Sequence, residues 1–190
     1  ASEKVEKSLS QYRINDAADH VYHLIWGSFC DWGLETAKNA LSGSDEKAKN
    51  NTISLLVYVL DGILRLASPI MPFVTEEIWQ KLPAHPAWDR PKALMIAKFP
   101  DADQLTRYAK EAEAWQAVQN LISGIRSVRT QAGIPPKTPL TAVIKATPEL
   151  TASYLAAKAD ICRLSGMSDF TAGPSVSRPP QSLVDVGRGY

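Results

Sequence analysis

The segment Leu66–Pro83, LASPIMPFVTEEIWQKLP, decides the fold. Pro69 and Pro72 interrupt a helical pattern here, because proline lacks an amide donor and disfavours helix in the residue before it. Pro72 is suited to the first position of the following helix. We expect Glu76 and Glu77 in the first turn of that helix, where carboxylates are stabilised by the helix dipole. The segment therefore predicts two helices joined by a tight turn.

Two long helices are predicted upstream of this turn. From Asn15 to Leu41 apolar residues recur at three- and four-residue steps, with Asn15 as the N-cap. Gly43 is suited to a left-handed position that ends this helix, and Ser44 to capping the next. The next helix runs to about Ala67, and its wide apolar stripe predicts a place inside a bundle.

A fourth helix is predicted further along the chain. Residues 94–99 suggest a short strand or extended cover, after which helical periodicity returns from about Leu105 to Gln131. Gly133 ends this helix, and Pro135-Pro136 prevents its resumption.

The period of the apolar residues then changes from about 3.6 to 2. Residues 140–145 predict a half-buried strand, and Thr147-Pro148 the start of a helix that Gly166 ends. Residues 183–186 read as another strand.

The fold class is mainly α: a helical bundle of about four long helices, followed by a small α/β appendage. We place the domains at 1–134 and 135–190.

Composition is that of an ordinary globular protein. Of 190 residues, 45% are hydrophobic and 22% charged, and the formal net charge is +1. Any nucleic-acid function must therefore come from local clustering of charge.

The longest apolar run, Leu55–Leu60, falls far short of a membrane span of roughly 20 residues. The N-terminus is charged where a secretory signal would be apolar, so we expect a cytoplasmic protein without a membrane partner.

The sequence predicts neither a metal site nor a cofactor site. Cys30 and Cys162 lack paired zinc-site spacing and are expected to be reduced, buried thiols. Asp16, His20 and His23 share a helical face that could in principle hold a metal, but solvated polar positions on an amphipathic helix are the favoured interpretation, because three ligands with no fourth are common by accident.

Catalytic signatures are also missing from the sequence. It contains no P-loop, dinucleotide-binding glycine loop, HExxH or GxSxG pattern. Glu76 and Glu77 would point about 100° apart on a helix, so they cannot form a facing acid and base pair. We assign no catalytic residue.

Charge is most asymmetric between Glu113 and Glu149, where no acidic residue occurs. Arg126 and Arg129 lie three residues apart on one helical face, and Lys137 follows them. Cations near a helix C-terminus are favoured by the dipole, so a purely structural role is also open. Lys38 is a further cation that could meet phosphate, beside aromatic residues whose spacing favours core positions: Tyr22, Phe29 and Trp32.

Three stretches together resemble one family. DAADHVYHLIWGSFCDWGLETAK, LDGILRLASPIMPFVTEEIWQKLP and ISGIRSVRTQAGIPPKTPL occur in this order. They resemble the anticodon-binding region of class I aminoacyl-tRNA synthetases, most closely that of valyl-tRNA synthetases. Gly33, where the family usually has tyrosine, and Asn50-Asn51, where an arginine is usual, depart from its pattern.

The resemblance implies a helix bundle that recognises the anticodon stem-loop of tRNA(Val). Arg126 and Arg129 match the family's paired arginines. HIGH and KMSKS motifs are missing, so the chain resembles an excised portion that would be inactive alone. The full-length parent would ligate valine to tRNA with ATP and magnesium, and its remaining domains would be partners in cis.

A rival interpretation from another class is a helical protein-protein interaction module without RNA binding. A large exposed apolar patch would favour it, whereas a continuous basic surface that joins Lys38, Arg126 and Arg129 would favour RNA.

Overall fold

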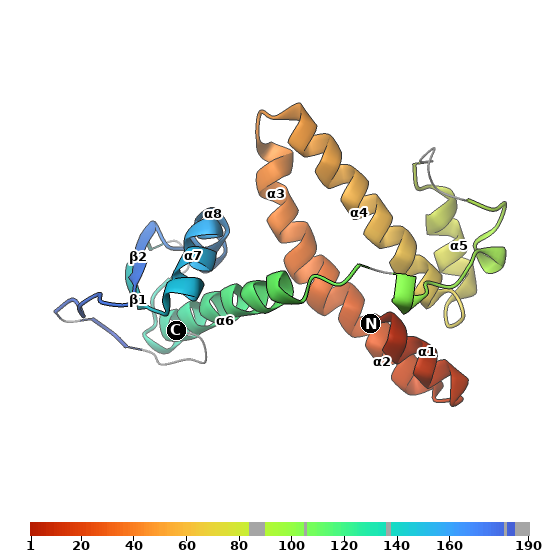
Figure 1. Cartoon of the computed structure of the whole chain (residues 1–190), viewed down its shortest axis with the longest axis horizontal. Coiled ribbons are helices and arrows are strands. Elements are labelled where there is room, and N and C mark those ends of the chain that lie inside the picture. Colours follow the sequence, from red (N-terminus) through yellow and green to blue (C-terminus); the bar gives the residue numbers. More distant parts are fainter. Residues whose placement is uncertain (84–89, 105, 136–137, 181, 185–190) are drawn as a thin grey trace. The chain divides into compact units, whose positions relative to one another are not determined.

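A computed structural model describes residues 1–83, 90–104, 106–135, 138–180 and 182–184. The chain divides into two compact units, Ala1–Thr106 and Arg107–Tyr190 (Figure 1). Each unit has buried residues of its own.

The first unit is helical. Its elements, in chain order, are α1 (Ser2–Ser10), α2 (Ile14–His23), the π-helix η1 (Leu24–Leu34), α3 (Glu35–Ser42), α4 (Glu46–Ala67), α5 (Pro72–Gln80), and the 3-10 turns η2 (Leu94–Ile96) and η3 (Ala102–Gln104).

The predicted helix-turn-helix is confirmed. α4 ends at Ala67, and Met71 N–H donates to Ala67 O at 2.9 Å across the turn. Pro72 occupies the start of α5, as its missing amide donor predicts. Glu76 and Glu77 lie beyond the first turn, which corrects their expected placement. Glu76 instead accepts a hydrogen bond from Leu94 N–H at 2.7 Å and so attaches η2 to α5.

The core of the first unit lies around this turn. One cluster joins Val5 of α1, Val21 of α2 and Leu66 of α4. A second places Trp79 of α5 against Leu64 and Leu94, and the Trp79 side chain is fully buried. Trp79 Nε1–H donates to Asp61 Oδ1 at 2.6 Å, because a buried indole requires an acceptor. The same carboxylate binds Arg65 Nε at 2.7 Å.

The long helix predicted from Asn15 is continuous but not α-helical throughout. Residues 24–34 form a π-helix of 11 residues, longer than the single-turn bulges that are typical. Gly27 and Gly33 lie within it, and glycine weakens the preference for α-helix. Arg13 precedes α2 without a side-chain cap, so the N-cap prediction for Asn15 was wrong.

Two further predictions in the first unit need correction. Gly43 has φ −68° and is extended instead of left-handed, and Asp45, not Ser44, caps α4 by accepting from two backbone amides. Only the C-terminal part of α4 is buried within its unit, whereas Leu55 is 60% exposed. Residues 94–96 form a 3-10 turn where a strand or extended cover was expected.

The second unit combines helices with two parallel strands. It contains α6 (Ala109–Gln131), β1 (Thr141–Lys145), α7 (Pro148–Ala156), α8 (Lys158–Ser165) and β2 (Asp169–Gly173). β1 and β2 pair in parallel, with Thr141 opposite Asp169 and Lys145 opposite Gly173. Fully or nearly fully buried side chains from the helices and strands form its interior, among them Val118, Leu121, Ile122, Ile144, Tyr154, Ile161 and Phe170.

Capping in this unit largely follows the prediction. Thr147 caps α7 with Pro148 at its start, and Gly166 ends α8 with φ 71°. The predicted single helix is divided at Ala157 into α7 and α8, and the strand β2 was not predicted. Of the strand predicted at 183–186, residues 185–186 lie outside the described part, and Leu183 and Val184 are not in a strand.

The mainly α class with a small α/β part is confirmed. The division of the chain into compact units differs from the predicted boundary near Pro135. α6 packs on α7 and α8, and therefore belongs to the second unit.

Candidate nucleic-acid interface

The paired arginines lie near the C-terminal end of α6. Gly133, with φ 64°, allows the chain to reverse there. Its N–H donates to Thr130 O at 3.1 Å, and Ile134 N–H donates to Arg129 O at 2.9 Å. These two bonds form the standard left-handed helix ending that glycine favours. The sequence prediction of a helix end at Gly133 is confirmed.

Arg129 points into the second unit and is only 5% exposed. Its Nη1 donates to Gly166 O at 3.0 Å, and its Nη2 donates to Pro135 O at 2.5 Å and Thr138 O at 2.9 Å. Within the described residues no carboxylate pairs with it. The partial negative charge of these carbonyl oxygens stabilises the buried guanidinium, and Gly166 O lies at the C-terminal end of α8.

Arg126 lies one turn earlier on the same face but is exposed. Its Nε donates to Leu164 O, in the last turn of α8, at 2.8 Å. Both Nη groups are unengaged as far as the described residues show. A guanidinium with two free Nη groups can bind a phosphate in a bidentate geometry.

Other cations of the second unit differ in their availability. Lys158 Nζ lies 2.6 Å from Asp169 Oδ1, and this bond lowers the pKa of the Asp169 carboxyl. Arg163 pairs with Asp160 at 3.6 Å. Arg126, in contrast, makes no ion pair within the described residues.

Of the two predicted lysines, only Lys38 belongs to the part of the chain that the structure describes. Lys137 lies outside the described residues. Lys38 is exposed on α3 in the first unit, where it pairs with Glu35, which offsets its charge. Arg129 is buried, so it cannot contribute to an exposed basic surface with Lys38 and Arg126.

Aromatic side chains of the first unit differ from the expected core stripe. Phe29 and Trp32 are half-buried, but Tyr22 is 57% exposed, so its core assignment was wrong. Trp26, four residues later, is 55% exposed. The π-helix changes the angle between successive residues at Trp26, but Tyr22 lies in α2 and is exposed although its spacing matches the apolar stripe.

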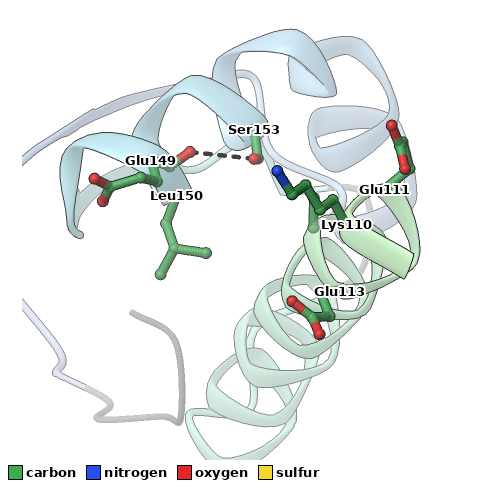
Figure 2. A pocket seen from close by; sticks show the side chains of 7 residues that line it. Lys110, Glu111, Glu113, Glu149, Leu150 and Ser153 are labelled. Carbon is green, nitrogen blue, oxygen red and sulfur yellow. Dashed lines mark hydrogen bonds between the residues drawn. The ribbon is translucent and has the colours of Figure 1, made fainter. Parts of the chain in front are cut away.

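The start of α6 has the opposite charge from its end. A hollow between α6 and α7 carries the carboxylates of Glu111, Glu113 and Glu149 and one ammonium group, that of Lys110 (Figure 2). Ser153 Oγ–H donates to Glu149 O at 3.2 Å across one turn of α7. The excess of acid disfavours phosphate, so the hollow is a poor site for RNA.

Neither a membrane span nor a metal cluster is found in the described part of the chain. None of its helices is long and apolar enough to cross a bilayer. No group of three His, Cys, Asp or Glu side chains there could hold a metal ion.

Cys30 and Cys162 are free and half-buried, not buried as expected. Burial raises the pKa of the Cys162 thiol, and nearby Asp169 raises it further.

Comparison with known proteins decides the family. The family described as "Anticodon-binding domain of tRNA ligase" matches residues 1–144, which include the whole first unit, α6 and both arginines. The chain belongs to this family. The resemblance inferred from the three sequence stretches is thereby confirmed.

Relatives of this anticodon-binding domain carry a specific name. The chain is 35% identical to a valine--tRNA ligase of Syntrophotalea carbinolica over 182 residues, which is 95% of the chain and 20% of the relative. It is 34% identical over 188 residues to that of Geobacillus kaustophilus, 98% of the chain and 21% of the relative. The match to the Rhizobium meliloti enzyme is 34% over 198 residues, 96% of the chain and 21% of the relative. The chain thus spans about a fifth of these relatives' length.

Proposed function

We propose that this chain recognises the anticodon stem-loop of tRNA(Val), as part of a larger valine-tRNA ligase. The family match supports tRNA as the partner, and the relatives' names support valine. Among the described residues, exposed Arg126 is the cation best suited to phosphate, because its Nη groups are free and it lies in an acid-free stretch.

The larger protein would supply the remaining chemistry. We expect its other domains, joined in cis, to bind ATP and magnesium and to ligate valine to tRNA. This chain would bind RNA without a cofactor or metal of its own, in the cytoplasm. Purified chain should therefore show no valine-dependent pyrophosphate exchange. Activity above background would contradict the proposal that the other domains carry the catalysis.

Filter binding tests the proposed function. We expect a tRNA(Val) transcript to be retained more strongly than a tRNA with a different anticodon, with affinity that falls as salt rises. Equal retention of both would leave only non-specific binding. No retention at low salt would remove the RNA-binding function.

An apolar groove keeps the rival interpretation testable. It lies between η1, α3 and α4 and is lined by Leu24, Phe29, Ala37, Leu55, Leu56 and Val59, among others. Apolar grooves can bind partner helices. The family match favours RNA over this alternative, and failure to retain either tRNA would reverse that preference.

A further inference from the structure

We propose that Arg129 is a positioning residue: it fixes the end of α8, which in turn orients Arg126 for RNA phosphate. The inference rests on the proposed function but assigns the two arginines different roles. Sequence similarity treats them as a pair, whereas their burial and hydrogen bonds separate them.

The Arg129 guanidinium joins the end of α6 to two other parts of the second unit. Arg129 lies in the last turn of α6 and binds Gly166 O at the end of α8. It also binds Pro135 O and Thr138 O in the segment that leads to β1. Ser168 N–H donates to Leu140 O at 2.8 Å directly before the two strands begin pairing. Arg129 therefore ties the end of α6 to the end of α8 and to the residues that precede β1.

Arg126 depends on the same end of α8. Its acceptor, Leu164 O, lies two residues before Gly166, whose carbonyl Arg129 holds. The bond through Nε restricts the long Arg126 side chain and leaves the Nη groups to the solvent. A side chain that is already restricted loses less conformational entropy when it binds phosphate.

The test uses Arg129→Lys, which keeps the buried positive charge but cannot reproduce three fork-shaped hydrogen bonds. We expect affinity of the folded variant for a tRNA(Val) transcript to fall about three- to tenfold, the range for one side chain that must be newly ordered. The slope of log K against log salt should not change, because Arg129 touches no phosphate. Arg126→Ala should instead make the slope shallower by roughly 0.7–0.9.

A double-mutant cycle separates positioning from general structural damage. If Arg129 acts through Arg126, Arg129→Lys should cause little further loss of affinity in the Arg126→Ala background. Arg163→Lys is the matched control, since Arg163 also lies in the second unit but forms a surface pair with Asp160. It should leave affinity and slope as in the wild type.

A spectroscopic measurement tests the inference without RNA. The Arg126 Nε–H signal in NMR should be protected from solvent exchange in the wild-type chain, and Arg129→Lys should remove that protection. If Arg129→Lys does not fold, Gly166→Ala provides the second variant. Its φ of 71° disfavours a side chain, so it should disturb the end of α8 while Arg129 is retained.

The outcomes are distinguishable. Equal effects of Arg129→Lys on affinity with and without Arg126, or retained Nε–H protection in a folded variant, would overturn the positioning role while RNA binding stands. A salt slope that becomes shallower when Arg129→Lys is added to the Arg126→Ala background would show that Arg129 itself contacts phosphate, and would overturn it too. If wild-type chain binds no tRNA, the proposed function fails, and the inference fails with it.

Discussion

Replacing Arg129 with alanine should destabilise the second unit strongly. The change removes a guanidinium that is 5% exposed and leaves the carbonyls of Gly166, Pro135 and Thr138 without their donor. A hydrogen bond to a charged group contributes about 1.5–3 kcal/mol, but three bonds from one side chain are not additive. Water can also reach part of the site. We therefore expect a loss of about 3–5 kcal/mol, which is less than the sum of three such bonds.

Arg126→Ala is the matched control on the same helix face. Arg126 is exposed and makes one bond to Leu164 O, so its replacement should cost about 1 kcal/mol or less. Both arginines lie outside the apolar stripe of their helix, and from this the sequence predicts that folding survives replacement of both by alanine. Because Arg129 is buried, we instead expect the double variant to be destabilised about as much as Arg129→Ala.

Native-state hydrogen exchange is the suitable assay, because one unfolding midpoint does not describe two compact units. Amides of β1 and β2 report on the second unit, and amides of α4 serve as an internal reference. Protection of the strands should fall in Arg129→Ala and stay near wild type in Arg126→Ala, with α4 unchanged in both. Equal strand protection in the two variants would refute the reasoning.

Three other outcomes are expected. Gly133→Ala should lower the free energy of opening of the second unit by about 1–2 kcal/mol in native-state hydrogen exchange, because its φ of 64° is unfavourable for a residue with a side chain; unchanged protection of β1 and β2 would mean that the turn can adopt another conformation. Asp61→Ala should lower the free energy of opening of α4 by about 2–4 kcal/mol in native-state hydrogen exchange and shift the tryptophan fluorescence, since it deprives the buried Trp79 indole N–H of its acceptor; unaltered protection of α4 would contradict the importance of that bond. At pH 8 Cys162 should react with iodoacetamide more slowly than a cysteine in an unfolded peptide, because its raised pKa leaves less thiolate; mass spectrometry that shows equal rates would disprove the shift.

Much of the fold could be predicted from local rules. Pro72, Thr147 and Gly166 each fix a helix boundary through the backbone geometry of one residue, and all three were placed correctly. The spacing of apolar residues, which changes from a period of about 3.6 to one of 2, likewise predicted α6 and β1. These features depend on neighbours in sequence, which a single chain displays directly.

Features that depend on distant contacts were not predictable in the same way. The strand Asp169–Gly173 pairs in parallel with β1, and its short segment carries little alternation of its own. Nothing in residues 24–34 specified a π-helix, although two glycines lowered the preference for α-helix. Tertiary context decides both.

The candidate site shows the same limit. An i, i+3 spacing correctly placed Arg126 and Arg129 on one helix face. It could not indicate that one would be buried against Gly166, 37 residues away, and the other exposed. The nearby Gly133 and Pro135 were the available signal, because a helix end and an irregular turn leave carbonyls that need donors.

A single exchange of the anticodon tests the central claim most directly. Affinity of the 190-residue chain would be measured by filter binding for a tRNA(Val) transcript and for the same transcript with only its three anticodon bases replaced. Anticodon recognition predicts weaker binding of the altered transcript, with a similar salt slope, because the bases change and the phosphates do not. Equal affinity for both transcripts would contradict the claim that this chain reads the anticodon.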